Sequence, residues 1–398
     1  MKDNRRGFLK KGTSLAAALS SGAVGASASP VTTDNRATAS KKVAWPVVEG
    51  VDTPKMTMNV GYNDMSSKVK AIKQFGADYV HMDAPALPWT VEKIQGIVDR
   101  FKSEGLSIIN HRIVLPPSIL HNMEGRDEDI KKVQDAIRIT GKVGIPVIEY
   151  NFYSHRLREG YYNSVGRGNA RYLSFDYNRK MPNPADNNWN EPRDRKADEM
   201  AFAASELKAT AAEPATSEEQ FWANITYFLK AIIPVAEQSG VKMALHPNDP
   251  PPPLSRGSAQ PMGSFAGWKK LLAIVDSPAN GMTFDCGVST EIGENAIDVL
   301  HYMAARNRIN HMHFRNVVVE TPRIKYTETY PDAGQVNMFA VMQELVRAKY
   351  KYGIFAEHPP GNIIDKERGG DFIGYIYNQA YARAMLQACL TIEQGYKG

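Results

Sequence analysis

The sequence predicts an α/β fold, a (β/α)8 TIM barrel with a long insertion after its fourth strand. Short apolar or β-branched runs alternate eight times with longer stretches whose apolar residues recur near helical spacing, which is typical of a parallel sheet. The region that holds these units is about 340 residues long, whereas such a barrel commonly needs about 250. We therefore expect one barrel domain with insertions. A doubly wound sheet is the structural alternative, because short strands are easily miscounted.

The expected elements follow one another in regular order. The strands are expected at 56–60, 79–82, 107–110, 146–150, 241–245, 281–284, 309–314 and 353–356. The helices between them are expected at 91–103, 127–143, 221–239, 265–275, 296–306 and 338–348. Parallel neighbours need such crossover connections, so this order supports the barrel.

A long polar segment follows the fourth expected strand. Residues from about 152 to 217 are rich in Arg, Asn, Tyr and Pro, and they far exceed an ordinary βα loop. In a barrel they would lie at the C-terminal mouth, where active sites are built, so we expect a lid or a pocket wall. Arg156, Arg158 and Tyr161 lie nearest the strand. A surface excursion without function is the alternative.

The N-terminus has three features of an export signal. Arg5 and Arg6 are followed by Phe-Leu-Lys, an Ala/Leu-rich stretch covers 15–24, and residues 26–28 form an Ala-x-Ala cleavage pattern. Residues 1–28 resemble a bacterial twin-arginine signal peptide. We therefore expect export of the folded protein to the periplasm or the cell exterior. A disordered basic tail is the alternative.

The rest of the chain has the composition of a globular protein. Residues 29–54 are expected to be a linker and 55–398 the barrel domain. The whole chain is 43% hydrophobic and 23% charged, which excludes a mostly disordered protein.

Its net charge is +5, of which the first 28 residues carry +4, so a nucleic-acid partner is not expected. No later run approaches the ~20 apolar residues of a membrane span. Cys286 and Cys389 are expected to be unconnected buried thiols, with one disulfide as the alternative.

Four of the expected strands end in a side chain that can bind a metal. These are His246 after Val-Lys-Met-Ala-Leu, Asp285 after Gly-Met-Thr-Phe, His313 in His-Met-His-Phe-Arg-Asn, and Glu357 in Phe-Ala-Glu-His-Pro-Pro. The separations of 39, 28 and 44 residues are each about one βα unit, so the four would converge at the barrel mouth from strands five to eight. Two imidazoles and two carboxylates suit Mn²⁺, Zn²⁺, Fe²⁺ or Co²⁺ and leave positions for substrate oxygens. A single such residue is more often a satisfied polar group, and the shared register favours the metal site.

Strand alternation leaves two ligand choices open. Asp285 and Cys286 face opposite ways, so only one can enter the pocket; we favour Asp285 and keep Cys286 in reserve as a softer donor. His311 faces the same way as His313 and is also held in reserve. Neighbours expected to contact substrate or support the ligands are Arg315, Asp249 and His358.

Several further segments carry a common pattern. They are Asn-Ile-Thr-Tyr through His-Pro-Asn-Asp-Pro-Pro at 224–251, Val-Asp-Ser-Pro-Ala-Asn-Gly at 275–281, His-Phe-Arg-Asn at 313–316 and Val-Asn-Met-Phe-Ala-Val-Met at 336–342. In order and spacing they resemble the mannonate dehydratase family, strongly over about 221–390 and more weakly from Lys55 onward. The resemblance implies a xylose-isomerase-like barrel that removes water from D-mannonate, giving 2-keto-3-deoxy-D-gluconate, with a divalent metal, usually Mn²⁺ or Fe²⁺.

The resemblance also implies the metal ligands. The family's two histidine ligands fall on His246 and His313, its cysteine ligand falls on Asp285, and its final aspartate falls on Glu357, followed by the retained His358. Related sugar isomerases and epimerases of the same barrel type use Asp and Glu at such strand ends. Metal binding is therefore expected to survive these changes.

The substrate site departs further from the family. Asn248 stands in place of an aspartate, an early Arg-Trp pair is replaced by Asn59 and Val60, and a Pro-Val-His-Glu stretch is absent. Each departure removes a group that could bind the substrate carboxylate or transfer a proton. The residues expected to bind substrate are Arg315, Asn316 and Asn248.

A dehydration of this kind needs a base, a cation to hold the enediolate charge, and an acid for the departing hydroxyl. The expected acid and base come from His358, Asp249, Tyr326 and Tyr377. The same base, cation and acid would also serve an isomerase or epimerase. The sequence thus leaves three functions open: a mannonate dehydratase-like lyase, an exported enzyme acting on another sugar or sugar acid, and a non-catalytic sugar-binding barrel. A homo-oligomer is compatible with all three.

Overall fold

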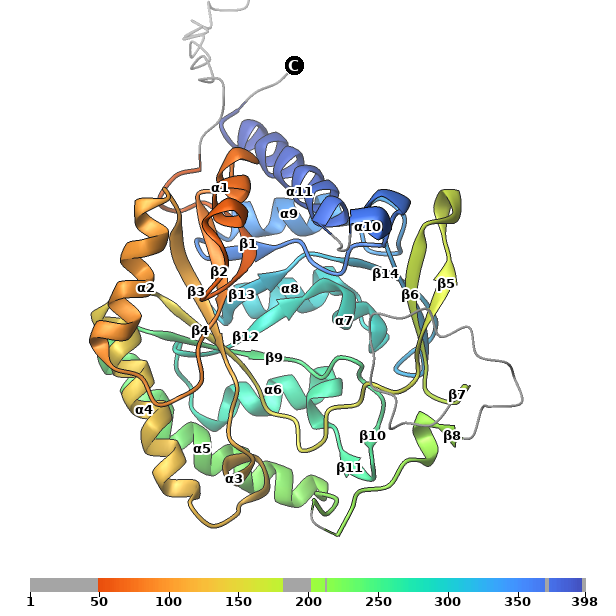
Figure 1. Ribbon diagram of the computed structural model, residues 1–398. Coiled ribbons are helices and arrows are strands. Elements are labelled where there is room, and N and C mark those ends of the chain that lie inside the picture. The colour runs from red at the N-terminus through yellow and green to blue at the C-terminus, as the bar shows by residue number, and fades with distance from the viewer. Residues whose placement is uncertain (1–48, 182–201, 212, 369–371, 396–398) are drawn as a thin grey trace, which may run out of the picture. The chain divides into compact units, whose positions relative to one another are not determined.

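A closed barrel of parallel strands forms the centre of the molecule. The computed structural model describes residues 49–181, 202–211, 213–368 and 372–395. Within them, eight strands close into a cylinder in which β1 pairs with both β2 and β16 (Figure 1). In chain order these strands are β1 (Lys55–Gly61), β2 (Tyr79–Asp83), β3 (Ser107–Ile113), β4 (Val147–Asn151), β9 (Lys242–His246), β12 (Asn280–Asp285), β13 (Ile309–His313) and β16 (Gly353–Phe355). All eight expected strands are confirmed, and closure of the sheet rules out the doubly wound alternative.

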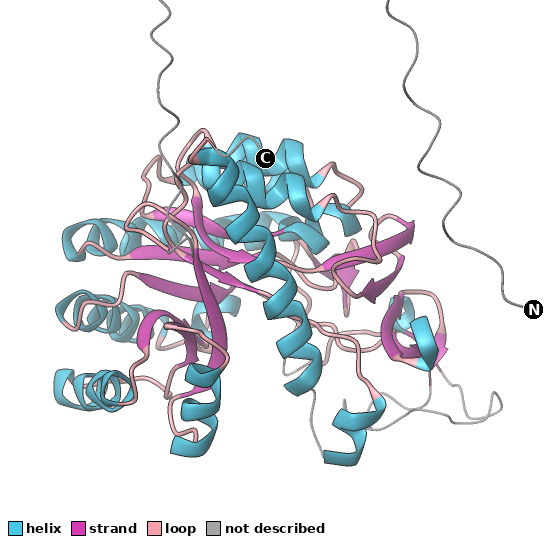
Figure 2. Cartoon of the chain, turned by 90° about the horizontal axis from the view of Figure 1, so that it is seen from above, coloured by secondary structure: helices cyan, strands magenta, loops and turns pink. Residues whose placement is uncertain are grey.

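Helices cover the outside of this barrel (Figure 2). In the described residues they are α1 (Ser66–Gln74), α2 (Val91–Ser103), α3 (Pro117–His121), α4 (Arg126–Lys142), α5 (Glu218–Ser239), α6 (Phe265–Ile274), α7 (Cys286–Glu291), α8 (Ala296–Ala304), α9 (Met338–Arg347), α10 (Ile363–Arg368) and α11 (Phe372–Glu393). Strands β12 and β13 are buried along their whole length because one face meets these helices and the other fills the barrel.

Local signals explain why six helices were expected and others were not. In α5, Ser217 and Gln220 form a reciprocal capping box, and Gly240 ends the helix in the left-handed conformation with φ 67°. By contrast, the apolar residues of α11 are spread around the helix, so its pattern has no strong apolar face. Helices α3, α7 and α10 have only five or six residues each, too few for a periodic signal.

The segment after β4 forms part of a second, smaller sheet. Its strands β5 (Tyr161–Val165) and β6 (Arg171–Asp176) join β14 (Asn316–Thr321) and β15 (Lys325–Thr329), which follow β13, in the antiparallel order β14-β15-β6-β5. The remaining short strands are β7 (Lys180–Met181), β8 (Phe202–Ala203), β10 (Leu254–Ser255) and β11 (Ser258–Ala259). The small sheet has its own core, made by Leu157, Tyr161, Phe175, Ala204, Leu207 and Tyr326. Two loops at the same end of the barrel are thereby tied together, and their role as a pocket wall stays a prediction.

Two expectations concern parts of the chain outside the described residues. The export signal of residues 1–28 and the linker up to residue 48 lie there, so both stay predictions. Among the helices that the structure does describe, none has the length and apolar character to cross a bilayer. Both cysteines are described, and both are free and buried, as expected.

Candidate metal centre

The four expected metal ligands come together at one rim of the barrel. His246, Asp285 and His313 are the last residues of β9, β12 and β13, and Glu357 lies two residues after β16. One donor atom from each lies within 4.8 Å of the others. We call these four residues the rim group. Parallel strands bring their carboxyl ends to the same rim, which is why residues so far apart in sequence meet here.

The donor atoms of the rim group converge. Nδ1 of His313 lies 3.1 Å from Nε2 of His246 and 2.7 Å from Oε1 of Glu357, and both imidazole nitrogens lie 3.8 Å from Oδ2 of Asp285. Nδ1 of His246 is 2.8 Å from the carbonyl oxygen of Pro247, which can only accept, so Nδ1 carries the proton. This tautomer leaves the lone pair on Nε2 directed at the other three donors. Two imidazoles and two carboxylates that converge on one point are typical ligands of a divalent metal.

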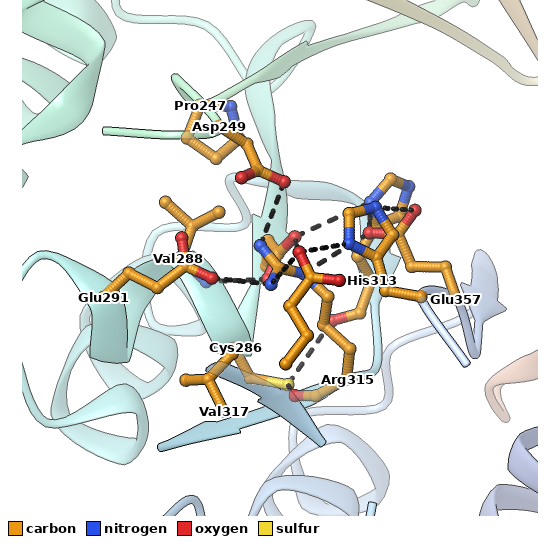
Figure 3. Close-up of polar contacts among 12 residues, drawn as sticks. Pro247, Asp249, Cys286, Val288, Glu291, His313, Arg315, Val317 and Glu357 are labelled. Atoms are coloured by element: carbon orange, nitrogen blue, oxygen red, sulfur yellow. Dashed lines mark hydrogen bonds and ion pairs between the residues drawn. The ribbon is translucent and has the colours of Figure 1, made fainter. Parts of the chain in front are cut away.

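The structure separates Asp285 from Cys286. Asp285 caps α7: its Oδ1 accepts a hydrogen bond from the main-chain N–H of Val288 at 2.8 Å, while Oδ2 faces the histidines. The Cys286 thiol points the other way and lies 3.4 Å and 3.1 Å from the carbonyl oxygens of His313 and Arg315 (Figure 3). Burial also raises the pKa of this thiol to about 12, which disfavours the thiolate that a metal would need. Cys286 is therefore outside the rim group.

A buried arginine stands behind the rim group. Arg315 is only 1% exposed, and five acidic side chains of the described chain lie around its guanidinium. Figure 3 shows Asp249 and Glu291 beside it. The shortest nitrogen–oxygen separations are 3.1 Å to Asp249, 2.9 Å to Asp285, 2.6 Å to Glu291, 3.9 Å to Glu328 and 3.6 Å to Glu357. The N–H donors of the guanidinium are therefore directed at carboxylates of the protein. These contacts favour a role in holding the ligands in place over the expected contact with substrate.

The same cluster controls protonation of its carboxyl groups. Burial raises the pKa of Glu291 well above its usual range despite the nearby Arg315. Burial acts the same way on Glu357, but the positive charges of His313 and His358 outweigh it and hold the Glu357 pKa well below its usual value. Glu357 is therefore the anion that a metal ligand must be.

Asp249 joins the small sheet to the barrel. Its Oδ2 lies 3.1 Å from Nη2 of Arg315, and its Oδ1 accepts hydrogen bonds from the phenols of Tyr161 at 3.0 Å and Tyr326 at 3.3 Å. The two phenol oxygens are 2.8 Å apart. Burial raises the pKa of Tyr326 well above its usual value, so the phenol stays protonated. Tyr161 and Tyr326 belong to the core of the small sheet, which therefore extends to the site.

His358 lies between the rim group and solvent. Its side chain is 30% exposed, Nδ1 lies 2.9 Å from Oε1 of Glu328, and Nε2 lies 3.5 Å from Oε2 of Glu357. Burial opposes its charge, but the two carboxylates prevail and raise the His358 pKa to about 10. The imidazole is thus a cation across the neutral pH range.

Three expected site residues have other surroundings. The amide of Asn316 is held by main-chain groups: Nδ2 donates to the carbonyls of Pro331 and Val336, and Oδ1 accepts from the N–H groups of residues 317 and 336. These hydrogen bonds fix the loop after β15, and a substrate contact of Asn316 stays a prediction. Tyr377 is 39% exposed and contacts Arg167 and Tyr330, away from the rim group. Asn248 is buried, with no hydrogen-bond partner for its Oδ1 among the described residues.

Sequence reasoning missed four polar residues around this centre. Glu291 comes from α7 and Glu328 from β15, and neither ends a barrel strand. His81 of β2 and Glu149 of β4 lie inside the barrel next to His313, with Nε2 of His313 3.3 Å from Oε1 of Glu149. A search for polar residues at inward-facing strand positions would have found His81 and Glu149. No local pattern marks Glu291 or Glu328.

Together, the closed barrel and the convergent imidazoles and carboxylates define a metal-binding (β/α)8 enzyme. The chain belongs to the D-mannonate dehydratase (UxuA) family, whose model matches residues 55–395. A mannonate dehydratase from Streptococcus equi subsp. zooepidemicus is 31% identical over 311 residues, covering 73% of this chain and 83% of that protein.

Solved structures agree with this assignment. The crystal structure of mannonate dehydratase from Streptococcus suis serotype 2 superposes with a TM-score of 0.71 at 25% identity, covering 86% of this chain and 97% of that one. A xylose isomerase domain protein from Alicyclobacillus acidocaldarius shares the fold, with a TM-score of 0.51 at 12% identity over 85% of this chain and 100% of that chain. The expected xylose-isomerase-like barrel is therefore confirmed.

Proposed function

We propose that this protein is a hydro-lyase that removes water from D-mannonate to give 2-keto-3-deoxy-D-gluconate. The observation that carries the proposal is the rim group: two histidines and two carboxylates converge at the mouth of a barrel whose chain belongs to the D-mannonate dehydratase family. The reaction takes a proton from C2 and a hydroxyl from C3, and the resulting enol becomes the 2-keto acid. The proton at C2 is weakly acidic because the carboxylate is adjacent, so charge stabilisation dominates the barrier.

The rim group fits a divalent cation, and we propose Mn²⁺ or Fe²⁺. Imidazole and carboxylate donors suit both ions, and the anionic state of Glu357 adds charge neutralisation. The bound ion would supply Lewis-acid stabilisation of the negative charge that develops on the substrate. Asp285 is held for this task at one oxygen by the start of α7 and at the other by Arg315.

We assign the acid role to His358. The departing hydroxyl must receive a proton, and this imidazole is a cation, part-exposed, and adjacent to Glu357. Asp249 is less suited to accept a proton, because its carboxylate already accepts from Arg315 and two phenols, and Arg315 and His358 outweigh burial to lower its pKa. We propose that Asp249 positions Arg315 and Tyr326, and that Asn248 contacts substrate.

His358→Gln should lower kcat on D-mannonate by about 10²–10⁴-fold, the usual contribution of a general acid. The wild-type kcat should not fall as the pH rises through 6.5, the ordinary histidine pKa, because His358 stays protonated up to about pH 10. Stopped assays across this pH range measure both effects. A His358→Gln enzyme with wild-type kcat would remove His358 from the mechanism.

The direct test of the function is product formation. The protein, loaded with Mn²⁺ or Fe²⁺, is incubated with D-mannonate, and 2-keto-3-deoxy-D-gluconate is measured against metal-stripped protein. We expect product only in the loaded samples. Absence of product with either ion contradicts the proposal.

The donor set also favours a second candidate, an isomerase or epimerase of another sugar. Asp285 occupies the position at which the family resemblance places a cysteine, so the rim group holds two carboxylates. A panel of sugars and sugar acids, followed by NMR for epimers and ketose–aldose pairs, distinguishes the two candidates. Interconversion without a 2-keto-3-deoxy product would favour this second reading.

A further inference from the structure

A layer of ionisable side chains lies inside the barrel next to the rim group. It consists of His81 from β2, Glu149 from β4, and His311 and His313 from β13. Their exposed fractions are 3%, 1%, 0% and 4%. Barrel interiors of this class are usually filled by Val, Ile and Leu. Three imidazoles and a carboxylate in such a layer are costly unless their polar atoms have partners.

These four side chains face one another. One donor atom from each lies within 4.8 Å of the others. Nε2 of His81 lies 3.1 Å from Oε2 of Glu149, and the rings of His81 and His311 are edge to face with centroids 5.0 Å apart. His311 precedes His313 by two residues on β13, so both project to the interior, as strand alternation requires. We call these four residues the inner group.

Several polar atoms of the inner group have no hydrogen-bond partner among the described residues. They are both ring nitrogens of His81, both ring nitrogens of His311, Nε2 of His313 and Oε2 of Glu149. A hydrogen-bonded histidine network would pair at least one nitrogen of each ring, because leaving one unpaired costs about 1–3 kcal/mol. Neither ring nitrogen of His311 has such a partner, and the ring of His81 approaches only Glu149, at 3.1 Å, so both rings are available as ligands.

We propose that the inner group is a second divalent-metal site, held by His81, Glu149, His311 and Nε2 of His313. The donor atoms lie slightly farther apart than the donors around one ion with metal–ligand bonds of about 2.1 Å. Small side-chain movements would bring them to binding distance. The single carboxylate offsets half of the ion's charge, and Oγ1 of Thr283, 2.9 Å from Oε1 of Glu149, holds that carboxylate in place.

The donors of the inner group specify which ion it takes. Three imidazoles and one carboxylate suit Zn²⁺ in tetrahedral coordination, whereas the rim group has two carboxylates and suits harder ions. The inner group offers only protein donors and is almost fully buried. We therefore assign it a closed structural site, in contrast to the open rim group.

His313 connects the two sites. Its Nδ1 faces the rim group and its Nε2 faces Glu149. With an ion at each nitrogen the ring is an imidazolate, and the proton it loses leaves to solvent. The two ions would then share one ligand, so occupation of the inner site fixes the orientation of His313 toward the rim.

Metal stoichiometry tests this proposal independently of activity. Full-length protein is stripped with chelator, saturated with Zn²⁺, dialysed and analysed by mass spectrometry for zinc per chain. We expect two ions in the wild type and one in His311→Phe, which replaces the imidazole by an apolar ring. His246→Ala should also retain one ion, because it alters only the rim group. The matched control His111→Gln changes a buried strand histidine that contacts Thr140 instead, and it should retain two.

A crystal of the zinc-loaded wild type provides the second measurement and does not depend on any variant folding. Anomalous scattering at the zinc edge should give one peak between His81, Glu149 and His311 and another at the rim group. No anomalous peak in the inner group overturns the proposal, and so does a single zinc per wild-type chain that lies at the rim group. Two ions in a folded His311→Phe variant would do the same.

Discussion

His246→Ala is expected to abolish metal binding at the rim group and nearly all turnover of D-mannonate. The substitution removes the imidazole whose Nε2 lone pair faces the other three donors. A Lewis-acid cation contributes several kcal/mol of charge stabilisation, and each 1.4 kcal/mol is tenfold in rate, so kcat should fall by about 10³-fold or more. Steady-state kinetics and the Mn²⁺ content of dialysed protein measure the two effects.

Cys286→Ala is the matched control for this experiment. It alters a residue next to a rim ligand, but the thiol faces main-chain carbonyls and not the rim group. The Mn²⁺ content should therefore equal that of the wild type. If Cys286→Ala lost the ion while His246→Ala kept it, the ligand set would be wrong.

Arg315→Met is expected to have the largest effect on stability. It removes the cation that lies among five buried acidic side chains and leaves the ionised ones without their counter-charge. Removal of one partner from a buried ion pair costs about 3–5 kcal/mol, and we expect a loss of this size in the free energy of unfolding. Urea denaturation of metal-stripped protein, followed by circular dichroism, measures it.

The control for Arg315→Met is a surface arginine in a simple ion pair. Arg138 lies 2.7 Å from Asp135, three residues earlier in α4, and both side chains are about half exposed. Arg138→Met should change stability by less than about 0.5 kcal/mol. Equal effects of the two substitutions would show that the carboxylates around Arg315 do not depend on its charge.

The convergence of the four candidate metal ligands could be predicted because strand ends converge in a barrel. His246, Asp285, His313 and Glu357 each follow a short apolar run, and the spacing of one βα unit carries each to the same rim. Alternation also indicated that only one of Asp285 and Cys286 faces the pocket, and the cap that Asp285 makes on α7 agrees with our preference for Asp285. These features depend on local periodicity, which a sequence displays directly.

The surroundings of Arg315 could not be predicted in this way. Glu291 reaches it from a six-residue helix and Glu328 from an edge hairpin, and Asp249 reaches it from a loop. The small sheet that pairs β6 with β15 joins two segments about 150 residues apart. The position of Arg315 and Asn316 in their motif is visible in the sequence, whereas their hydrogen-bond partners are not.

The amino-acid order alone determined the (β/α)8 class, the eight strands and the strand ends that carry the candidate metal donors, because backbone periodicity and one-face burial are local properties. Only the tertiary structure decided which polar groups meet: the five carboxylates on Arg315, the phenols on Asp249, and the inner group of His81, Glu149, His311 and His313. Contacts across a closed barrel depend on the stagger between strands and on the loops that cover its mouth. Those are set by packing of the whole chain, and no short window of sequence contains them.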